Sequence, residues 1–118
     1  GLRRDEPENT AAGIAAIVDE IQIRSPDTKI LLLGIFPRGA IRKHPLRLLN
    51  TKVNDLLPTL AEDKNINYLD ISDTFLNRRG LLPREVMYDF LHPTVEGYQM
   101  WAEAISPTVL ELMRETSR

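Results

Sequence analysis

The 118-residue sequence contains no cysteine, which excludes disulfide bridges and thiolate metal sites. It has no long hydrophobic run either, because its longest apolar stretch, Ile30 to Phe36, is far too short to span a bilayer. An excess of one charge is also lacking, and a net charge of -2 gives no reason to expect a nucleic acid or an anionic membrane as partner. The balance of 42% hydrophobic and 27% charged residues is typical of a globular protein, here of one domain at most.

The first half of the sequence alternates helical and strand patterns. Apolar residues at three- and four-residue spacing after Thr10 predict a helix that ends at Ser25, because a residue before proline avoids helical geometry. The buried face that we expect for this helix is Ile14, Ile17, Val18 and Ile21. Residues 29–36 are short and continuously apolar, which is typical of a strand buried on both faces of a parallel sheet. A second amphipathic helix is expected over 46–60, with Pro58 ending or kinking it.

The second half predicts one more strand, at 66–71, and one more helix after a loop-rich stretch at 72–93. Thr94 is a good N-cap residue for that helix, and Pro107 is expected to kink it or to begin a new segment. Its expected buried face is Tyr98, Trp101, Ala102 and Ile105.

Strands that alternate with helices predict an α/β fold with a parallel sheet. Two strands alone would leave an apolar sheet edge unpaired. We therefore expect further strands, from outside this sequence, to lie beside residues 29–36.

One loop segment, YDFLHPT at 88–94, contains an aspartate and a histidine that can act together in acid–base chemistry. An aspartate three residues before a histidine can bring its carboxylate to one ring nitrogen, which fixes the tautomer and stabilises the imidazolium. The other nitrogen can then act as a general base toward a hydroxyl nucleophile. By spacing alone, an ordinary surface pair of Asp89 and His92 is the more common explanation. A metal site is disfavoured, because the only other histidine, His44, is distant in sequence and no acidic cluster accompanies the pair.

Several segments carry a family resemblance in their order and spacing. They are SPDTKILLLG at 25–34, FPRG at 36–39, HPLR at 44–47 with Asn50, Val53 and Asn54 behind it, YLDI at 68–71, and DFLH at 89–92 with Thr94, Gly97, Tyr98 and Trp101 behind it. Together they make the chain from Thr28 to its end resemble the SGNH/GDSL-type serine esterase family. Within that family the resemblance is closest to proteins like the catalytic subunits of platelet-activating factor acetylhydrolase IB.

The resemblance implies a flavodoxin-like, three-layer α/β/α sandwich with a parallel sheet. Residues 1–118 would be the C-terminal part of a single SGNH hydrolase domain and would lack its N-terminal strands. The resemblance also implies a Ser-Asp-His triad, with Asp89 as the acid and His92 as the base, in a chain order that α/β hydrolytic triads can take. The family's Gly-Asp-Ser nucleophile block and its two oxyanion-hole blocks have no match in this sequence. Residues 1–4, GLRR, stand near the expected place of the oxyanion-hole asparagine block; Gly1 can correspond to its glycine, but residues 2–4 depart from it.

No serine of the chain replaces the nucleophile well. The serines are Ser25, Ser72, Ser106 and Ser117. Only Ser72 follows a predicted strand, near the sheet edge where α/β active sites gather, and it has no elbow glycines around it. We therefore expect Ser72 to be a turn or cap hydroxyl.

Three further residues are candidates for substrate binding. Phe90 and Leu91 flank the acid and the base, so they can line an acyl pocket or pack in the core. Arg38 follows the first predicted strand and can reach an active-site mouth, although anchoring its own loop is the commoner role for such an arginine. Asn50 and Asn54 are expected to be solvated or to pin a loop, with a substrate role as the alternative.

These residues together predict carboxylic ester hydrolysis in which this chain supplies only the acid and the base, and is inactive alone. The expected substrate is an acyl ester of a small molecule, a lipid or an acetylated carbohydrate. The expected partner is the missing N-terminal segment or a partner chain, with a homo-oligomer as a further option. We expect no cofactor, no metal, no nucleic acid and no membrane span. The alternative function is a non-catalytic pairing or assembly module, a truncated SGNH-like subunit.

Overall fold

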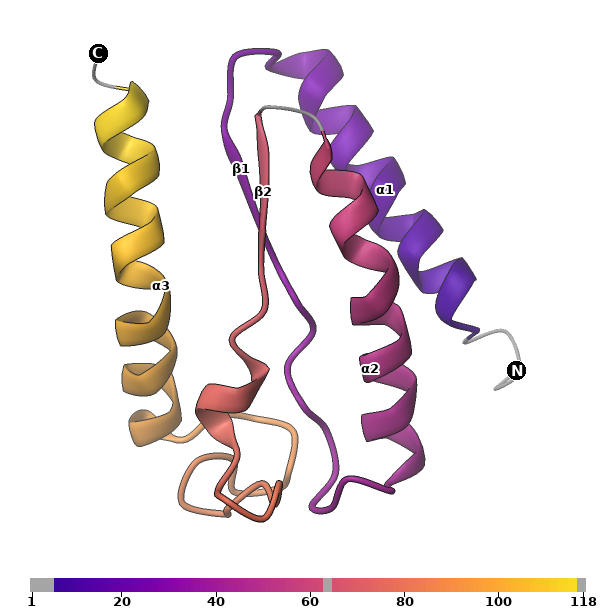
Figure 1. The fold of residues 1–118 in the computed structure, drawn as a ribbon, viewed down its shortest axis with the longest axis vertical. Coiled ribbons are helices and arrows are strands. Elements are labelled where there is room, and N and C mark those ends of the chain that lie inside the picture. The colour runs from indigo at the N-terminus through magenta and orange to yellow at the C-terminus, as the bar shows by residue number, and fades with distance from the viewer. Residues whose placement is uncertain (1–5, 63–64, 117–118) are drawn as a thin grey trace. The chain divides into compact units, whose positions relative to one another are not determined.

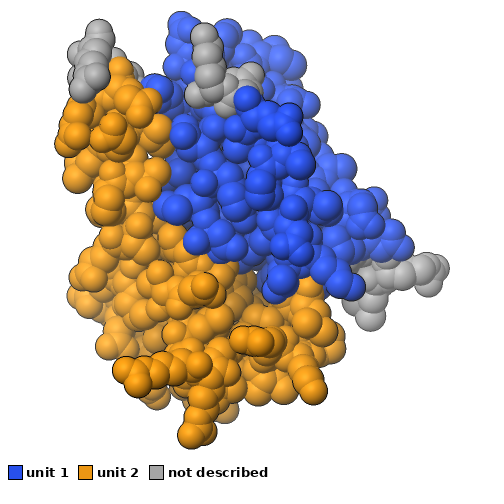
Figure 2. Space-filling model, viewed as in Figure 1, with its two compact units in different colours: residues 1–35, 49–70 blue, residues 36–48, 71–118 orange. Residues whose placement is uncertain are grey.

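A computed structural model describes residues 6–62 and 65–116 of the chain. Its elements are α1 (Pro7–Arg24), β1 (Ile30–Leu33), α2 (Pro45–Leu56), the 3₁₀ helix η2 (Leu57–Glu62), β2 (Ile66–Leu69), the 3₁₀ helix η3 (Ser72–Phe75) and α3 (Val95–Thr116), shown in Figure 1. They belong to two compact units, one of residues 1–35 and 49–70 and one of residues 36–48 and 71–118 (Figure 2). Within the described ranges, no helix is both long and apolar enough to cross a membrane.

The first unit contains the sheet. β1 and β2 pair in parallel, with Ile30 opposite Ile66 and Leu33 opposite Leu69, which confirms the predicted α/β class. In Figure 1, α1 and the part of α2 in this unit both lie to the right of the strand pair. All residues of β1 are only half-buried, whereas the sequence predicts a strand buried on both faces. The physical reason is that, in the part of the chain described, β1 has a neighbouring strand on one edge only.

Both strands are shorter than the predicted ranges 29–36 and 66–71. After β1, side-chain hydrogen bonds take the place of hydrogen bonds between strands. The Oδ1 atom of Asn54 accepts the Ile35 N–H at 2.7 Å, and its Nδ2 donates to the Ile35 carbonyl at 2.9 Å. Asn54 thus pins the chain after β1, one of the two roles expected of it. β2 stops at Leu69 because its partner Leu33 is the last residue of β1.

Pro58 ends α2 as predicted, since α2 stops at Leu56 and continues as η2. A proline has no N–H, so Pro58 cannot donate to the Asn54 carbonyl one helical turn earlier. The Tyr68 hydroxyl of β2 donates to that carbonyl instead, at 3.3 Å. Burial, reinforced by the charges of Asp70 and Asp55, raises the pKa of Tyr68 to about 12, so its hydroxyl remains a proton donor at neutral pH.

The second unit has its own core, which includes the buried residues Ile71, Phe75, Leu82, Val86 and Met87. Aromatic rings join η3 to α3: the Phe36 ring centroid lies 4.7 Å from that of Phe75 and 4.9 Å from that of Trp101. Aromatic pairs at this spacing add about 0.5–1.5 kcal/mol beyond the area they bury.

Thr94 caps α3, as predicted. Its hydroxyl accepts the Gly97 N–H at 3.1 Å and donates to the Glu85 carbonyl at 2.5 Å, so it also ties the helix to the preceding loop.

Three predicted core positions are wrong. Tyr98 is 54% exposed even though it stacks on Trp101, because Trp101 covers one side of the ring and is itself only half-buried. Ala102 is exposed, and Ile17 is 62% exposed although Val18 beside it is buried. The apolar stripes of these helices are therefore wider than the faces that the described residues cover.

Pro107 does not begin a new segment, since α3 continues through it to Thr116. Pro107 and Glu103, whose carbonyl loses its helical donor there, are both exposed, so water can solvate that carbonyl.

At two helical glycines, we expect an added methyl group to change the free energy of unfolding in opposite directions. A Cβ atom at Gly97 would overlap the Val86 carbonyl oxygen, whereas a Cβ at Gly13 would meet nothing within 4 Å. Gly97→Ala should lower the free energy of unfolding by about 1–3 kcal/mol through overpacking. Gly13→Ala should raise it by about 0.5–1 kcal/mol, because alanine favours the helix. Urea unfolding measures both, and shifts of the same sign would contradict this packing.

Candidate active site

The Asp89 carboxylate is held by its own loop. Its Oδ2 accepts the Nδ1–H of the His92 ring at 2.6 Å. Its Oδ1 accepts the backbone N–H of His92 at 2.7 Å and that of Leu91 at 3.0 Å. The contact that the spacing of the two residues predicts is therefore present. A carboxylate that receives bonds on both oxygens keeps one orientation, and so does the ring bonded to it.

These hydrogen bonds lower the pKa of Asp89 to about 2, chiefly through the backbone N–H of His92 and then through its ring. Because the folded pKa lies below the unfolded value of about 3.9, ionised Asp89 favours the folded chain at pH values above about 4. That contribution is lost as the pH falls from about 4 toward 2. At neutral pH the carboxylate can only accept, so Nδ1 of His92 carries the proton.

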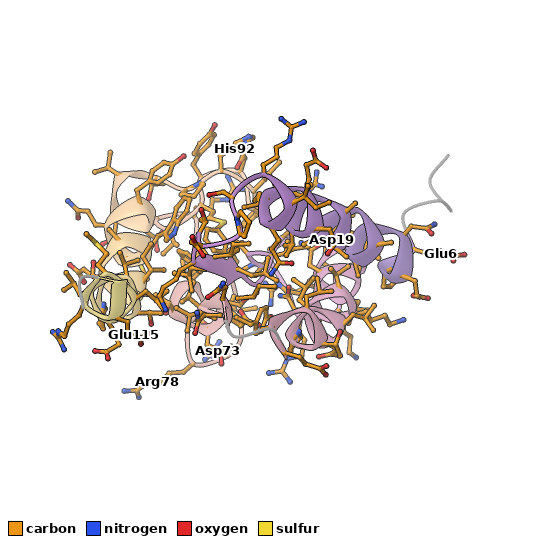
Figure 3. All side chains as sticks on the ribbon, turned by 90° about the horizontal axis from the view of Figure 1, so that it is seen from above. Glu6, Asp19, Asp73, Arg78, His92 and Glu115 are labelled. Atoms are coloured by element: carbon orange, nitrogen blue, oxygen red, sulfur yellow. The ribbon has the colours of Figure 1, made fainter. Side chains whose placement is uncertain are left out.

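The other ring nitrogen of His92, Nε2, makes no hydrogen bond to its own loop. The His92 side chain is 62% exposed, and Figure 3 shows it at the periphery. Within the described residues its Nε2 has no hydrogen-bond partner, so the lone pair of Nε2 is accessible. The Tyr88 ring lies nearly parallel to the imidazole, with 6.1 Å between their centroids. Chemically, an accessible imidazole nitrogen backed by a carboxylate can accept a proton from an alcohol.

Phe90 separates the acid from the base and has an unusual backbone. Its φ of 61° is left-handed, and it is the one non-glycine residue with positive φ among those described. Its N–H donates to the Met87 carbonyl at 3.0 Å, and its carbonyl accepts the Gly39 N–H at 3.1 Å. The Arg84 guanidinium lies 5.0 Å from the centroid of the Phe90 ring. Phe90 is half-buried and Leu91 is 41% exposed, and their roles in substrate binding remain predictions.

Arg38 does not anchor its loop, which corrects the commoner role expected of it. Its side chain is exposed and makes no hydrogen bond or ion pair with the residues that the structure describes. Arg47 anchors that loop instead, by donating to the Gly39 carbonyl at 2.8 Å. Arg47 was not predicted from the sequence, where its one signal is its place in the HPLR segment at 44–47. A role of Arg38 in substrate binding remains a prediction.

The serines lie in separate places. Ser25 is the C-cap of α1, where its hydroxyl is bonded to that of Thr28, and Ser72 opens η3 and is half-buried. Ser106 donates to the Ala102 carbonyl at 2.5 Å, whereas Ser117 and the segment 1–4 lie outside the described residues. Asn50 is half-buried in α2. In the ranges 6–62 and 65–116, no group of three or more His, Cys, Asp or Glu residues could hold a metal ion.

Comparison with known proteins gives a consistent result. The sequence profile of the GDSL-like Lipase/Acylhydrolase family matches residues 1–100. Platelet-activating factor acetylhydrolase IB subunit alpha2 of Rattus norvegicus is 40% identical over 110 residues, covering 92% of this chain and 48% of that protein. The subunit alpha1 of Bos taurus is 33% identical over 109 residues, covering 92% of this chain and 47% of its own. The chain thus spans about half the length of these relatives.

A solved structure has the same fold. It is described as that of a candidate platelet activating factor from Streptococcus pneumonia. The likeness has a TM-score of 0.72 at 20% sequence identity, and it covers 86% of this chain and 51% of that one. It confirms the predicted fold class, a partial α/β sandwich with a parallel sheet.

Because the backbone of Phe90 is left-handed, we expect glycine at this position to give a more stable chain than alanine, the reverse of the usual order. Alanine at positive φ costs about 1–2 kcal/mol, which exceeds the roughly 0.5–1 kcal/mol by which flexible glycine ordinarily weakens a fold. Phe90→Gly should therefore be more stable than Phe90→Ala by about 0.5–1 kcal/mol in urea unfolding. At Leu91, where φ is not positive, the alanine variant should be the more stable one. If the alanine variant were the more stable one at both Phe90 and Leu91, the left-handed conformation of Phe90 would be refuted.

Proposed function

The chain belongs to the GDSL-like lipase/acylhydrolase family, and on that basis we propose that it supplies the acid and the base of a serine-dependent ester hydrolase. Residues 1–118 would then be the C-terminal part of a single hydrolase domain. The observation that carries this proposal is the 2.6 Å hydrogen bond from His92 Nδ1 to Asp89, made by a ring whose side chain is 62% exposed and whose Nε2 has no partner among the described residues. It is the arrangement that a general base needs when it activates a hydroxyl.

In the proposed reaction, Nε2 of His92 takes the proton of a serine hydroxyl as the serine oxygen attacks the ester carbonyl carbon. Asp89 stays ionised and stabilises the imidazolium that forms. The tetrahedral intermediate then collapses, and His92 returns the proton to the departing alkoxide oxygen. Water repeats the cycle on the acyl-serine, with His92 as its base, and releases the carboxylic acid and the free serine.

The proposed substrate is an acyl ester of a small molecule, a lipid or a carbohydrate. The named relatives are acetylhydrolases, which favours a short acetyl group among these. Leu91, which is 41% exposed and precedes the base, offers an apolar contact for the acyl chain beside Phe90. Arg38 precedes Gly39, whose N–H donates to the Phe90 carbonyl. The exposed guanidinium of Arg38 is therefore a candidate contact for an anionic part of the substrate.

We further propose that the nucleophile and the oxyanion-hole donors come from outside this chain, from an N-terminal segment or a partner. Two observations support this. The chain spans about half the length of its relatives, and β1 is half-exposed with one neighbouring strand among the described residues. Loss of one oxyanion-hole donor already costs about 10²–10³ in rate, so the chain alone should show no turnover.

A second candidate is a non-catalytic pairing or assembly module, including a homo-oligomer. It is favoured by apolar side chains that α3 exposes, namely Val95, Tyr98, Leu110 and Met113. An exposed apolar face often marks an interface between proteins. The named relatives are subunits, which fits either candidate.

A chimera separates the two candidates. Fusing residues 1–118 after the part of the Rattus norvegicus relative that they do not match should give an esterase that hydrolyses p-nitrophenyl acetate. In the chimera, His92→Ala and Asp89→Asn should each lower kcat by about 10³–10⁴-fold, because both leave the ring unable to act as an oriented base. Asp73→Asn is the matched control, since Asp73 is exposed at η3, and it should leave kcat unchanged.

Two results would overturn this proposal. Hydrolysis by residues 1–118 alone, abolished by His92→Ala, would mean that the nucleophile lies within this chain and would point to Ser72. A folded chimera without activity, together with binding of residues 1–118 to the other half supplied as a separate polypeptide, would favour the pairing module.

A further inference from the structure

Arg47 is the only charged side chain buried among the described residues, with 5% of its surface exposed. It lies in the first turn of α2, which His44 caps: Nδ1 of His44 accepts the Leu46 N–H at 3.2 Å. Burial, together with the neighbouring charge of Arg42, lowers the pKa of Arg47 from its ordinary value. A buried guanidinium is costly unless good hydrogen bonds compensate it, so its contacts identify what it holds.

Its contacts include the backbones of two loops. One arm of the guanidinium donates to the Gly39 carbonyl and the other to the Gly80 carbonyl, each at 2.8 Å. The loops are also joined directly, because the Leu82 N–H donates to the Ala40 carbonyl at 3.0 Å. A planar fork can donate to two acceptors at once, which a lysine ammonium on a flexible stem cannot do with the same geometry.

Gly39 connects Arg47 to the loop that carries Asp89 and His92. Its carbonyl accepts from Arg47, while its N–H donates to the Phe90 carbonyl at 3.1 Å. The φ of Gly39 is +87°, and a Cβ atom there would overlap the His44 ring, so the position requires glycine. A continuous path of hydrogen bonds thus runs from a buried charge to the left-handed residue between the acid and the base.

We propose that Arg47 is a positioning residue for the Asp89–His92 pair. By fixing Gly39, it holds the Phe90 carbonyl, and thereby keeps Phe90 in the left-handed conformation that turns both the Asp89 carboxylate and the His92 imidazole to the same side of their loop. The inference concerns geometry that the chain itself contains, and it bears on catalysis only through the proposed function.

The test measures the loop rather than the activity. In the wild-type chain, the side-chain carboxyl ¹³C resonance of Asp89 should titrate at about pH 2, because three N–H donors hold the carboxylate. Arg47→Met should raise that midpoint by about one unit, a ~10-fold weaker acid, as the loop relaxes and these bonds lengthen. Arg47→Lys should raise it by less. The midpoint is read from the resonance of the folded chain alone, because unfolded chain would titrate at the ordinary Asp value of about 3.9.

Arg78→Met is the matched control, since Arg78 projects outward from an exposed loop of the same unit (Figure 3). It should leave the Asp89 midpoint where it is in the wild-type chain. If Arg47→Met does not fold, Arg47→Lys decides the question, and a wild-type midpoint in a folded Arg47 variant would overturn the inference.

In the active chimera, Arg47→Lys should lower kcat more than it changes KM. An inactive wild-type chimera would defeat the proposed function, yet the titration would still decide the role of Arg47.

Discussion

The candidate active site depends on one carboxylate, that of Asp89, keeping one orientation. Asp89 does so although 37% of its side chain is exposed, because donors from within the next three residues occupy both of its oxygens. An exposed ion pair by itself contributes little, since water competes for both partners. Here two backbone donors cannot move away from the carboxylate without rebuilding the loop. The backbone therefore sets the orientation of the imidazole, and its second nitrogen has no hydrogen-bond partner among the described residues.

The rest of the second unit can be understood as support for that loop. Thr94 ties its end to the start of α3 and to the carbonyl of Glu85. In the middle of the loop, the Phe90 carbonyl accepts a hydrogen bond from Gly39, whose own carbonyl accepts one from Arg47. The first unit uses the same device, since Asn54 and Tyr68 satisfy backbone groups that a proline and a strand end leave without ladder partners. In each unit, irregular backbone is fixed in one conformation by side chains that hydrogen-bond to it.

The local features were predictable because neighbouring residues determine them. The cap at Thr94, the end of α2 before Pro58 and the Asp89–His92 hydrogen bond all follow from side chains a few residues apart. Burial was less predictable, because it depends on what covers a helix or strand. Tyr98 and β1 have the composition of core elements, yet the described residues do not cover them fully. Arg47 was missed because its acceptors are carbonyls up to 33 residues away, and any residue type supplies a carbonyl.

The ring tautomers of the two histidines test the central claim most directly. A long-range ¹H–¹⁵N correlation spectrum, at a pH where both rings are neutral, reports which nitrogen carries the proton. His92 should carry it on Nδ1, since that nitrogen donates to Asp89, whereas His44 should carry it on Nε2, since its Nδ1 accepts from Leu46. The two rings should thus be opposite tautomers in one molecule. A His92 ring protonated on Nε2 would mean that Asp89 does not orient it, and the account of this site would fail.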